Sequence, residues 1–364
     1  CIFLQVFLIG FEISAICMTF CTEVIVSSIL RIGIVGLGRL GKRHAENLSR
    51  KVQGASLVAA ASPVDLEREW AEKNFGIATY ESLDELLDHS DAEIIWLVTP
   101  TSLHADQCIQ VLEAGKHVFC EKPLALDVES CDRVIEIAKE HPKQRIMIGF
   151  MRRFDPAYSQ VKREIENYGL GRIFRIHSES HDPIDPDGFF LKFAPTSGGI
   201  FLDCAIHDID LTRWMLGGLE PKRVTAYGTR VMYPGLESCN DVDTAVATVE
   251  FEKDVLATFH VSRTSHKGYQ AIMTVTGTEG AINCGCGLSE LPLLREKHGE
   301  TRIQGQTDFF SRFSDAFLYE ANAFVASISS GVSVGATLED AREATRLAIA
   351  MRESLEKRTS IKLD

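Results

Sequence analysis

A turn rich in glycine carries the first side-chain pattern that points to chemistry. Gly36, Gly38 and Gly41 directly follow the apolar run at residues 32–35 and precede a run compatible with a helix at 42–50. Between such a strand and such a helix, the first glycine permits a tight turn, the second lets the backbone approach a pyrophosphate, and the third lets the helix pack against the strand. The free N–H groups of the helix start attract phosphates. We therefore predict a dinucleotide-binding turn, which also includes Leu37, Arg39 and Leu40.

Lys122 is the second candidate, because it lies between Glu121 and Pro123 just after the apolar run at residues 117–120. Proline biases the residue before it towards an extended backbone, which holds the ammonium group near the end of the strand. A lysine taken alone is more often a surface charge. At the carboxyl end of a buried strand, however, it lies where parallel sheets bind their ligands.

Asp203 and His207 form the third candidate pattern. A helix that begins near Asp203 and ends at the glycine pair at residues 217–218 would place Asp203, His207 and Asp210 on one face. A carboxylate one turn from an imidazole can fix its tautomer or share a substrate hydroxyl with it. The alternative is a solvated polar face on an amphipathic helix. A metal site would need at least one more ligand, so we expect none.

Alternating strand and helix patterns over the first 150 residues position the first two candidates. Strands are expected at residues 31–35, 56–61, 94–98, 117–120 and 145–149, with helical segments between them. Such alternation predicts a parallel sheet with helices on both faces, and ligands at the carboxyl ends of its strands. The glycine turn, Ser62, Thr99, Pro100 and Glu121 then lie along one crevice.

The pattern changes after residue 150. Strands with partial alternation are expected at 173–178, 223–228, 244–251, 255–262 and 271–277, which favours a mostly antiparallel sheet. A final helix is expected at 337–357. We predict an α/β protein with a nucleotide-binding domain at residues 30–150 and an α+β domain at 151–364. Residues 1–29 are apolar but carry neither a secretory signal pattern nor a membrane anchor, so we expect them to lie outside the fold.

Length, charge and cysteine content narrow the class of protein. The 364 residues suit two domains, and the net charge of −13, without a basic block, argues against nucleic acid or a membrane as the main partner. Ten cysteines are scattered along the chain, which predicts free thiols and a cytoplasmic location.

The motifs together resemble the glucose-fructose oxidoreductase/inositol dehydrogenase/rhizopine catabolism (Gfo/Idh/MocA) family over about residues 31–355. The resemblance rests on the glycine turn, the Thr99-Pro100 turn with His104, the Glu121-Lys122-Pro123 element, and Asp203 with His207. The segments 149–155 and 181–183 are similar to the inositol 2-dehydrogenase branch. The resemblance implies a Rossmann domain, a C-terminal domain with a large, mostly antiparallel open sheet, and a homodimer or homotetramer.

The same resemblance implies roles for individual residues. Lys122 would hold the reacting hydroxyl, His207 would be the general acid/base, and Asp203 would bind substrate and orient the site. Cofactor contacts would come from the glycine turn and from Ser62, Thr99, Pro100, His104, Glu121 and Lys122. Polyol contacts would come from Arg152, Asp182, Tyr269 and Gln270.

One departure concerns the cofactor. Members that prefer NAD usually carry an acidic residue at the end of the second strand, where this chain has Ser62. Asp65 could restore a preference for NAD and Arg68 could favour NADP, so the residues leave both open. The branch resemblance favours NAD.

The expected function is an NAD(P)-dependent dehydrogenase acting on a cyclic polyol or sugar, with a myo-inositol-like substrate. The alternatives are a reductase or dehydrogenase of another sugar or of a non-sugar carbonyl, and an enzyme that uses NAD transiently to eliminate a glycosidic group. A dinucleotide sensor without catalytic activity is a further alternative. The presence of Lys122, Asp203 and His207 together argues against the sensor, because binding alone needs none of them.

Overall fold

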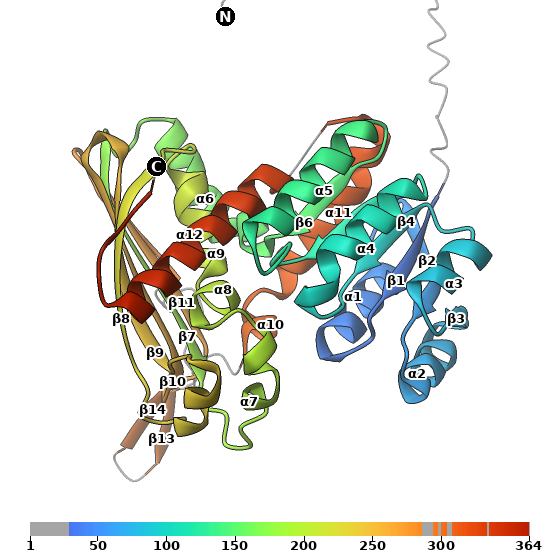
Figure 1. Ribbon diagram of the computed structural model, residues 1–364, viewed down its shortest axis with the longest axis horizontal. Helices are drawn as coiled ribbons and strands as arrows, with labels where there is room; N and C mark the ends of the chain where they lie inside the picture. The colour runs from blue at the N-terminus through green and yellow to red at the C-terminus, as the bar shows by residue number, and fades with distance from the viewer. Residues whose placement is uncertain (1–28, 286–293, 298–299, 304–307, 333–334, 364) are drawn as a thin grey trace, which may run out of the picture.

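The computed structural model describes residues 29–285, 294–297, 300–303, 308–332 and 335–363. Two large sheets lie at opposite ends of the molecule, and helices fill the space between them (Figure 1). The predicted N-terminal extension lies outside the described residues except for the exposed Ile29.

The N-terminal sheet is fully parallel and has the strand order β3-β2-β1-β4-β5-β6. This order is that of a Rossmann fold, with the point of reversal between β1 and β4. All four residues of β4 are buried, as is usual for a parallel strand covered on both faces. The strands are β1 (Leu30–Val35), β2 (Ala55–Ala61), β3 (Ala78–Tyr80), β4 (Ile94–Leu97), β5 (His117–Glu121) and β6 (Ile146–Gly149).

The helices that connect these strands confirm the predicted alternation. A Ser82 side chain caps α3 and an Asp127 side chain caps α5, each by accepting a backbone N–H of the first turn. The connecting helices are α1 (Arg39–Arg50), α2 (Asp65–Phe75), α3 (Leu83–His89), α4 (Thr101–Glu113) and α5 (Val128–Glu140).

The C-terminal sheet has seven strands in the order β12-β11-β7-β10-β9-β8-β15. Its neighbouring strands are antiparallel except for β7 and β10, which run parallel. The mostly antiparallel sheet is therefore confirmed. Its strands are β7 (Ile173–Pro183), β8 (Pro221–Thr229), β9 (Thr244–Phe251), β10 (Val255–Ser265), β11 (Gln270–Gly277), β12 (Ala281–Cys284) and β15 (Ile361–Lys362), and a separate hairpin joins β13 (Leu294–Lys297) to β14 (Glu300–Ile303).

One face of this sheet packs against helices and the other does not (Figure 1). Along β7, Ile176, Ser178 and Ser180 are buried, whereas the alternate residues His177 and Glu179 are half-buried. The covered face therefore faces the Rossmann domain, and the outer face carries the second set of side chains. The longer helices of this domain are α6 (Pro156–Glu166), α9 (Ile206–Met215), α11 (Ser314–Ser330) and α12 (Leu338–Lys357).

Short helical segments complete the domain. They are η1 (Met151–Phe154), α7 (Phe190–Phe193), η2 (Ala194–Thr196), α8 (Ile200–Asp203), η3 (Pro234–Cys239), η4 (Glu252–Asp254) and α10 (Phe309–Arg312).

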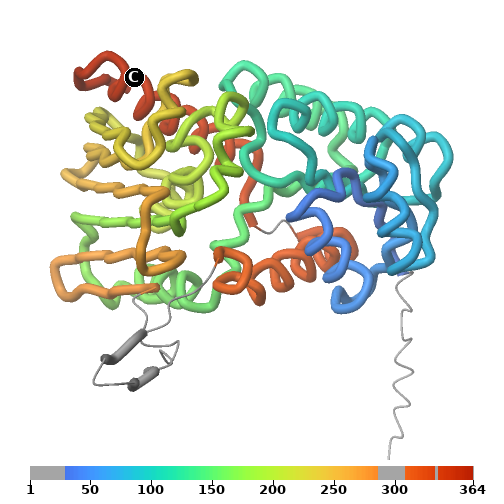
Figure 2. Tube along the Cα trace, turned by 90° about the horizontal axis from the view of Figure 1, so that it is seen from below, coloured from blue at the N-terminus to red at the C-terminus, as the bar shows by residue number. Residues whose placement is uncertain are grey.

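Helix α11 returns to the Rossmann domain and completes its core (Figure 2). Phe324 and Val325 of α11 are buried in one apolar cluster with Trp96 of β4 and Phe119 of β5. The Trp96 and Phe119 rings stack with centroids 3.7 Å apart. Residue 150 lies between the last strand of the N-terminal sheet and the first strand of the C-terminal sheet, and the core around the N-terminal sheet includes a segment from the later part of the chain.

The predicted helix around His207 is two helices. Helix α8 ends at Asp203, and α9 begins at Ile206. The backbone N–H of Ala205 donates to the carbonyl oxygen of Ile200, five residues back, so the regular hydrogen-bond ladder is interrupted between them. Asp203 and His207 consequently come from different helices.

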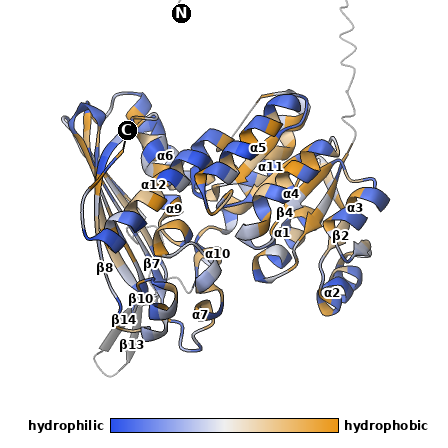
Figure 3. Cartoon of the chain, viewed as in Figure 1, coloured by the Kyte–Doolittle hydropathy of each residue, from blue (hydrophilic) through white to orange (hydrophobic). Residues whose placement is uncertain are grey.

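Hydropathy follows the layers of the structure (Figure 3). The central strands of the Rossmann sheet are apolar, and the helices that cover them carry an apolar and a polar side. Within the described ranges, none of the helices combines the length and the hydropathy that crossing a bilayer would take.

Candidate active site

A cavity of about 380 Å³ lies between the two domains, next to the carboxyl end of β5. The three residues expected to act in catalysis, Lys122, Asp203 and His207, all line it. Lys122 follows β5, Asp203 is the last residue of α8, and His207 lies in the first turn of α9. Apolar walls come from the aromatic side chains Phe189, Phe190, Phe193, Phe309 and Phe317.

The Lys122 ammonium group is held across the cavity. Its Nζ donates to the backbone carbonyl oxygen of Asp203 at 3.2 Å, and its backbone N–H donates to the Glu121 carboxylate at 3.2 Å. The other oxygen of Glu121 lies 2.8 Å from Nε2 of His44. Because Nδ1 of His44 accepts the indole N–H of Trp96, Nε2 is the nitrogen that donates to Glu121. This buried chain fixes the backbone before Lys122, and the peptide bond after it, to Pro123, is cis.

His207 is almost completely buried and is held as a neutral imidazole. Burial lowers its pKa well below the ordinary value of 6.5, and the positive charges of Lys122 and Arg152 lower it further. Among the described residues, Nδ1 of His207 has no hydrogen-bond partner. The ring packs edge-on against Phe150, with centroids 5.9 Å apart. At neutral pH the imidazole can therefore accept a proton from a bound hydroxyl.

Arg263, at the ninth position of β10, joins the two carboxylates of the site. Its guanidinium donates to Asp203 at 2.5 Å and lies 3.4 Å from Asp182. Burial alone would raise the pKa of Asp203, but Arg263 and Lys122 outweigh it and lower that pKa. Asp203 is thus ionised. Arg263 could not be predicted from the sequence, because its partners lie 60 and 81 residues away and no local motif marks it.

Arg152 and Tyr269 also line the cavity, where they belong to a buried polar cluster. The Arg152 guanidinium donates to Asp208 at 3.0 Å and, through its other terminal nitrogen, to the hydroxyls of Ser180 and Tyr269, each at 2.9 Å. Asp182 lines the same cavity at the end of β7.

Gln270 is not brought to the cavity. It lies opposite His181 in the β11–β7 pairing, and its side-chain oxygen is 3.3 Å from Nδ1 of His181. Tyr269 and Gln270 are adjacent in an extended segment, so their side chains point to opposite faces of the sheet. Only Tyr269 faces the cavity.

Asp210 leaves the predicted common face. Its carboxylate accepts two hydrogen bonds from Arg153, at 2.6 and 2.9 Å, and Arg153 also reaches Asp340 at 3.1 Å. His207 and Asp210 are both buried. Neither the three-residue face nor a solvated polar face describes this helix, because α9 is surrounded by protein on all sides.

The glycine turn has the shape needed to hold a dinucleotide pyrophosphate. A Cβ atom on Gly36 would lie 2.5 Å from the backbone oxygen of Val98, and one on Gly41 would lie 2.0 Å from that of Gly36. At Gly38, by contrast, a Cβ would meet no atom within 4 Å. This open space lies at the start of α1, whose first turn carries no acidic residue.

The remaining turn residues divide into cavity-lining and buried ones. Arg39 and Leu40 line the cavity, so the start of α1 opens directly into it. Leu37 is buried in the core of the Rossmann domain, which leaves its backbone as the part that can meet a cofactor.

The end of β2 lies beside a carboxylate that the sequence did not predict at this place. The hydroxyl of Ser62 donates to Glu67 at 2.6 Å. Arg68 donates to the carbonyl oxygen of Ser62 at 2.7 Å and to Asp65 at 2.5 Å. Ser62 therefore holds Glu67 near the position where other Rossmann domains carry an acidic residue, and Arg68 is engaged by its neighbours.

The Thr99-Pro100 turn and His104 connect two strand ends. The His104 ring lies between the backbone oxygens of Thr99, at 2.8 Å, and Pro123, at 2.7 Å. Burial lowers its pKa, although both carbonyl contacts oppose that shift. His104 thus fixes the turn after β4 to the turn after β5, which carries Lys122, and it lies behind the residues that line the cavity.

Comparison with protein families gives two matches that together span most of the described chain. Residues 30–150 match the model of an oxidoreductase family with an NAD-binding Rossmann fold, and residues 158–283 match the model of the GFO/IDH/MocA C-terminal domain.

Individual relatives are similar over nearly their whole length. The chain is 34% identical to myo-inositol 2-dehydrogenase of Thermotoga maritima, covering 92% of this chain and 99% of the relative. It is also 34% identical to scyllo-inositol 2-dehydrogenase (NAD⁺) of Bacillus subtilis, covering 92% and 96%. Among solved structures, scyllo-inositol dehydrogenase of Lactobacillus casei with bound NAD(H) and scyllo-inositol superposes with a TM-score of 0.86 at 36% identity, covering 92% of this chain and 98% of that one.

Proposed function

Because the chain belongs to the GFO/IDH/MocA oxidoreductase family, with its NAD-binding Rossmann fold, we propose that it is an NAD-dependent dehydrogenase that oxidises a secondary hydroxyl group of an inositol or a closely related cyclic polyol. One observation carries the proposal. Lys122, Asp203 and His207, which come from three different elements, line one cavity that the glycine turn also reaches. The names of the relatives support the substrate class.

The chemistry divides between the cofactor and the chain. Bound NAD supplies the hydride acceptor. His207, neutral and buried, takes the proton of the reacting hydroxyl. The Lys122 ammonium group stabilises the negative charge that develops on the substrate oxygen. Asp203 holds a neighbouring hydroxyl, and its contact with the Arg263 guanidinium keeps its carboxylate in place.

The polar residues of the cavity suit a ring that carries several hydroxyl groups. The carboxylates of Asp182 and Asp203 accept hydrogen bonds, whereas Lys122 and Arg263 donate them. The aromatic side chains of α7 and α10 limit the opening and exclude water from the reacting carbon. The cavity therefore offers a polyol both hydrogen-bond donors and hydrogen-bond acceptors.

The arrangement at the end of β2 favours NAD over NADP. Glu67, held by Ser62, places a negative charge where the additional phosphate of NADP would lie. Arg68, the residue that could attract that phosphate, donates to Ser62 and Asp65 instead. We infer that Glu67 accepts hydrogen bonds from the ribose hydroxyl groups.

A homo-oligomer accompanies this function. The outer face of the C-terminal sheet exposes the apolar side chains of Tyr227, Val246 and Leu256, which lie on the three neighbouring strands β8, β9 and β10. Large exposed apolar side chains gathered on one face favour association. A second copy of this chain in isologous contact would cover them, giving a dimer or, with a further interface, a tetramer. Light scattering of the purified chain measures its oligomeric state. The cytoplasmic location stays a prediction.

Absorbance at 340 nm tests the function. The purified chain is mixed with NAD or NADP and a panel of inositols and aldoses, and separately with NADH or NADPH and simple ketones. We expect formation of reduced cofactor with at least one inositol, and a higher kcat/KM with NAD than with NADP. Tight NAD binding without turnover on any inositol would contradict the proposal and favour a dinucleotide sensor. A rate confined to ketones would favour a carbonyl reductase.

A further inference from the structure

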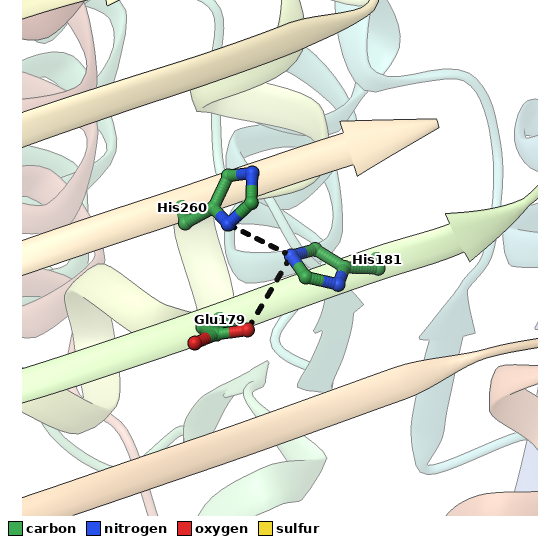
Figure 4. Close-up of side chains that lie close together, drawn as sticks. All are labelled: Glu179, His181 and His260. Carbon is green, nitrogen blue, oxygen red and sulfur yellow. Dashed lines mark hydrogen bonds and ion pairs between the residues drawn. The ribbon is translucent and has the colours of Figure 1, made fainter. Parts of the chain in front are cut away.

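The outer face of the C-terminal sheet carries a group of side chains that the dehydrogenase chemistry does not use. Glu179 and His181 lie on β7, and His260 lies on the neighbouring strand β10, where it is paired with Glu179 in the parallel register. All three side chains point to the same side of the sheet and toward one another (Figure 4). We propose that Glu179, His181 and His260 bind a divalent transition metal ion of the Zn²⁺ type.

The positions of the ligand atoms carry the proposal. One carboxylate oxygen of Glu179 and one ring nitrogen from each histidine lie within 4.8 Å of one another. Nε2 of His181 is 3.2 Å from Nδ1 of His260 and 3.7 Å from Oε2 of Glu179. Ligand atoms bound tetrahedrally to zinc at its usual distances lie about 3.3 Å apart. The two measured separations are close to that value, and the third, between His260 and Glu179, lies within 4.8 Å.

The neighbouring side chains fix these ligands as a metal site requires. Nδ1 of His181 lies 3.3 Å from the side-chain oxygen of Gln270. A proton on Nδ1 donates to that oxygen and leaves the lone pair of Nε2 directed at the site. Histidines that bind metals almost always donate their other N–H in this way. Gln270 therefore has a place next to this cluster, away from the cavity.

His177 holds the carboxylate of Glu179 in place, as Gln270 holds the ring of His181. Its Nε2 lies 2.7 Å from Oε1 of Glu179, and its Nδ1 lies 2.7 Å from the hydroxyl of Thr258. Oε1 is thus occupied, and Oε2 is the oxygen that faces His181. This division of the carboxylate between a supporting residue and a metal is common around zinc.

Charge also suits a cation at this place. Burial would raise the pKa of Glu179, but the histidines His177, His181 and His260 outweigh it and lower that pKa. Burial and the nearby His181 lower the pKa of His260. Glu179 is therefore ionised at neutral pH. Two imidazoles and one carboxylate form a ligand set that suits zinc and leaves a fourth position for water or for a facing copy of the chain.

A bound ion would join β7 to β10 at a place that matters for the site. His181 directly precedes Asp182, and His260 lies three residues before Arg263. These two residues contact each other in the cavity on the opposite face of the sheet. The metal would thus hold the two strand ends from which the Asp182 and Arg263 side chains extend.

Metal titration of the full-length chain tests the proposal. The protein is first treated with a chelator under conditions that keep its cysteines reduced. It is then titrated with Zn²⁺, followed by calorimetry, and with Co²⁺, followed by absorbance. We expect one ion per chain, with a Co²⁺ spectrum that lacks the intense charge-transfer band of thiolate ligands. His260→Ala and Glu179→Gln should each weaken binding at least about tenfold. His266→Ala is the matched control, because His266 is an exposed histidine of the β10–β11 connection, and should leave binding unchanged.

Three outcomes would overturn the proposal: no saturable uptake, equal binding by His260→Ala and the unaltered chain, or a spectrum dominated by thiolates. Thermal melts and NAD binding of the variants show whether each one folds. The cluster lies outside the cavity, so a chain inactive on every inositol can still bind the metal, and failure of one proposal leaves the other intact.

Discussion

The proposed chemistry depends on a few side chains whose charges are set by their surroundings. Lys122 and His207 face the same cavity, and the positive charge of the first helps to keep the second neutral. A neutral histidine can accept a proton, and a lysine with its proton can stabilise an oxyanion, so the two side chains have complementary roles.

Replacing Lys122 with alanine tests the first of these roles. We expect kcat for inositol oxidation to fall by about 10³-fold, a typical loss for removing one group that stabilises an oxyanion. NAD binding, measured by fluorescence, should be largely kept. Lys139→Ala is the control, because Lys139 is exposed and pairs with Glu136 on the surface. Full activity of the Lys122 variant would show that this lysine takes no part in catalysis.

The pH dependence of oxidation tests His207. Because its pKa lies well below 6.5, the imidazole stays neutral through neutral pH and becomes protonated only in more acidic solution. The protonated ring cannot accept the substrate proton, so kcat/KM should be level near pH 7 and fall on the acidic side of pH 6.5. His207→Gln should be much slower and should lose this limb. An inflection above pH 6.5 that persists in the variant would assign it to another group.

Gly38 tests the cofactor site separately from catalysis. A Cβ at this position meets no atom of the chain within 4 Å, so Gly38→Ala should unfold at the same temperature as the unaltered chain. The added methyl would occupy the space proposed for the pyrophosphate, and NAD binding should weaken at least about tenfold, or about 1.4 kcal/mol. Gly41→Ala should instead lose stability, because its Cβ would overlap the backbone of Gly36. Unchanged NAD affinity in Gly38→Ala would place the pyrophosphate elsewhere.

At the scale of elements, buried ion pairs hold the segments that carry the site. Arg152 and Arg153 of η1 pair with Asp208 and Asp210 of α9, respectively. The first residues after the Rossmann sheet are thereby attached to the helix of His207. These pairs set the position of α9 with respect to β6, and with it the distance between the imidazole and the cofactor turn.

Asp208→Asn should be costly for this reason. The substitution leaves the charge of Arg152 buried without its counter-ion, and we expect the free energy of unfolding to fall by about 3–5 kcal/mol. Asp106→Asn breaks an exposed pair with Arg133 and should cost less than about 1 kcal/mol. Urea unfolding of both variants measures the difference. Equal small losses would mean that the buried pair does not fix α9.

The sequence predicted the elements better than the contacts between them. Buried parallel strands are continuous apolar runs, so β1, β2, β4, β5 and β6 were visible directly. The break between α8 and α9 was not, because it depends on a single backbone hydrogen bond from Ala205 to Ile200. Helix α11 was also not predicted, because its apolar residues pack against Trp96 and Phe119, which lie in a distant part of the chain.

The site shows the same division. Lys122 and His207 were predicted because each lies in a local motif, and the resemblance to a family gave them roles. Arg263 and Glu67 were missed, because their importance comes from Asp203 and Ser62, which the fold brings to them. Gln270 could have been separated from Tyr269 by the two-residue period of a strand, which sends adjacent side chains to opposite faces.

At the scale of the whole molecule, the cavity proposed as the reaction site is shared between the two domains. The Rossmann domain contributes the glycine turn and Lys122, and the C-terminal domain contributes Asp203, His207 and Arg263. Helix α11 packs into the Rossmann core and so attaches the domains on a second side (Figure 2). The proposed meeting of cofactor and polyol in this cavity therefore requires both domains to hold their positions.

Transfer of a labelled hydride tests the central claim most directly. The chain is incubated with NAD and scyllo-inositol that carries deuterium on its ring carbons, and the reduced cofactor is analysed by mass spectrometry. We expect each reduced cofactor molecule to gain one deuterium, because the hydrogen comes from the oxidised carbon. No reduction, or reduced cofactor without deuterium, would contradict the proposal that this cavity oxidises a cyclic polyol.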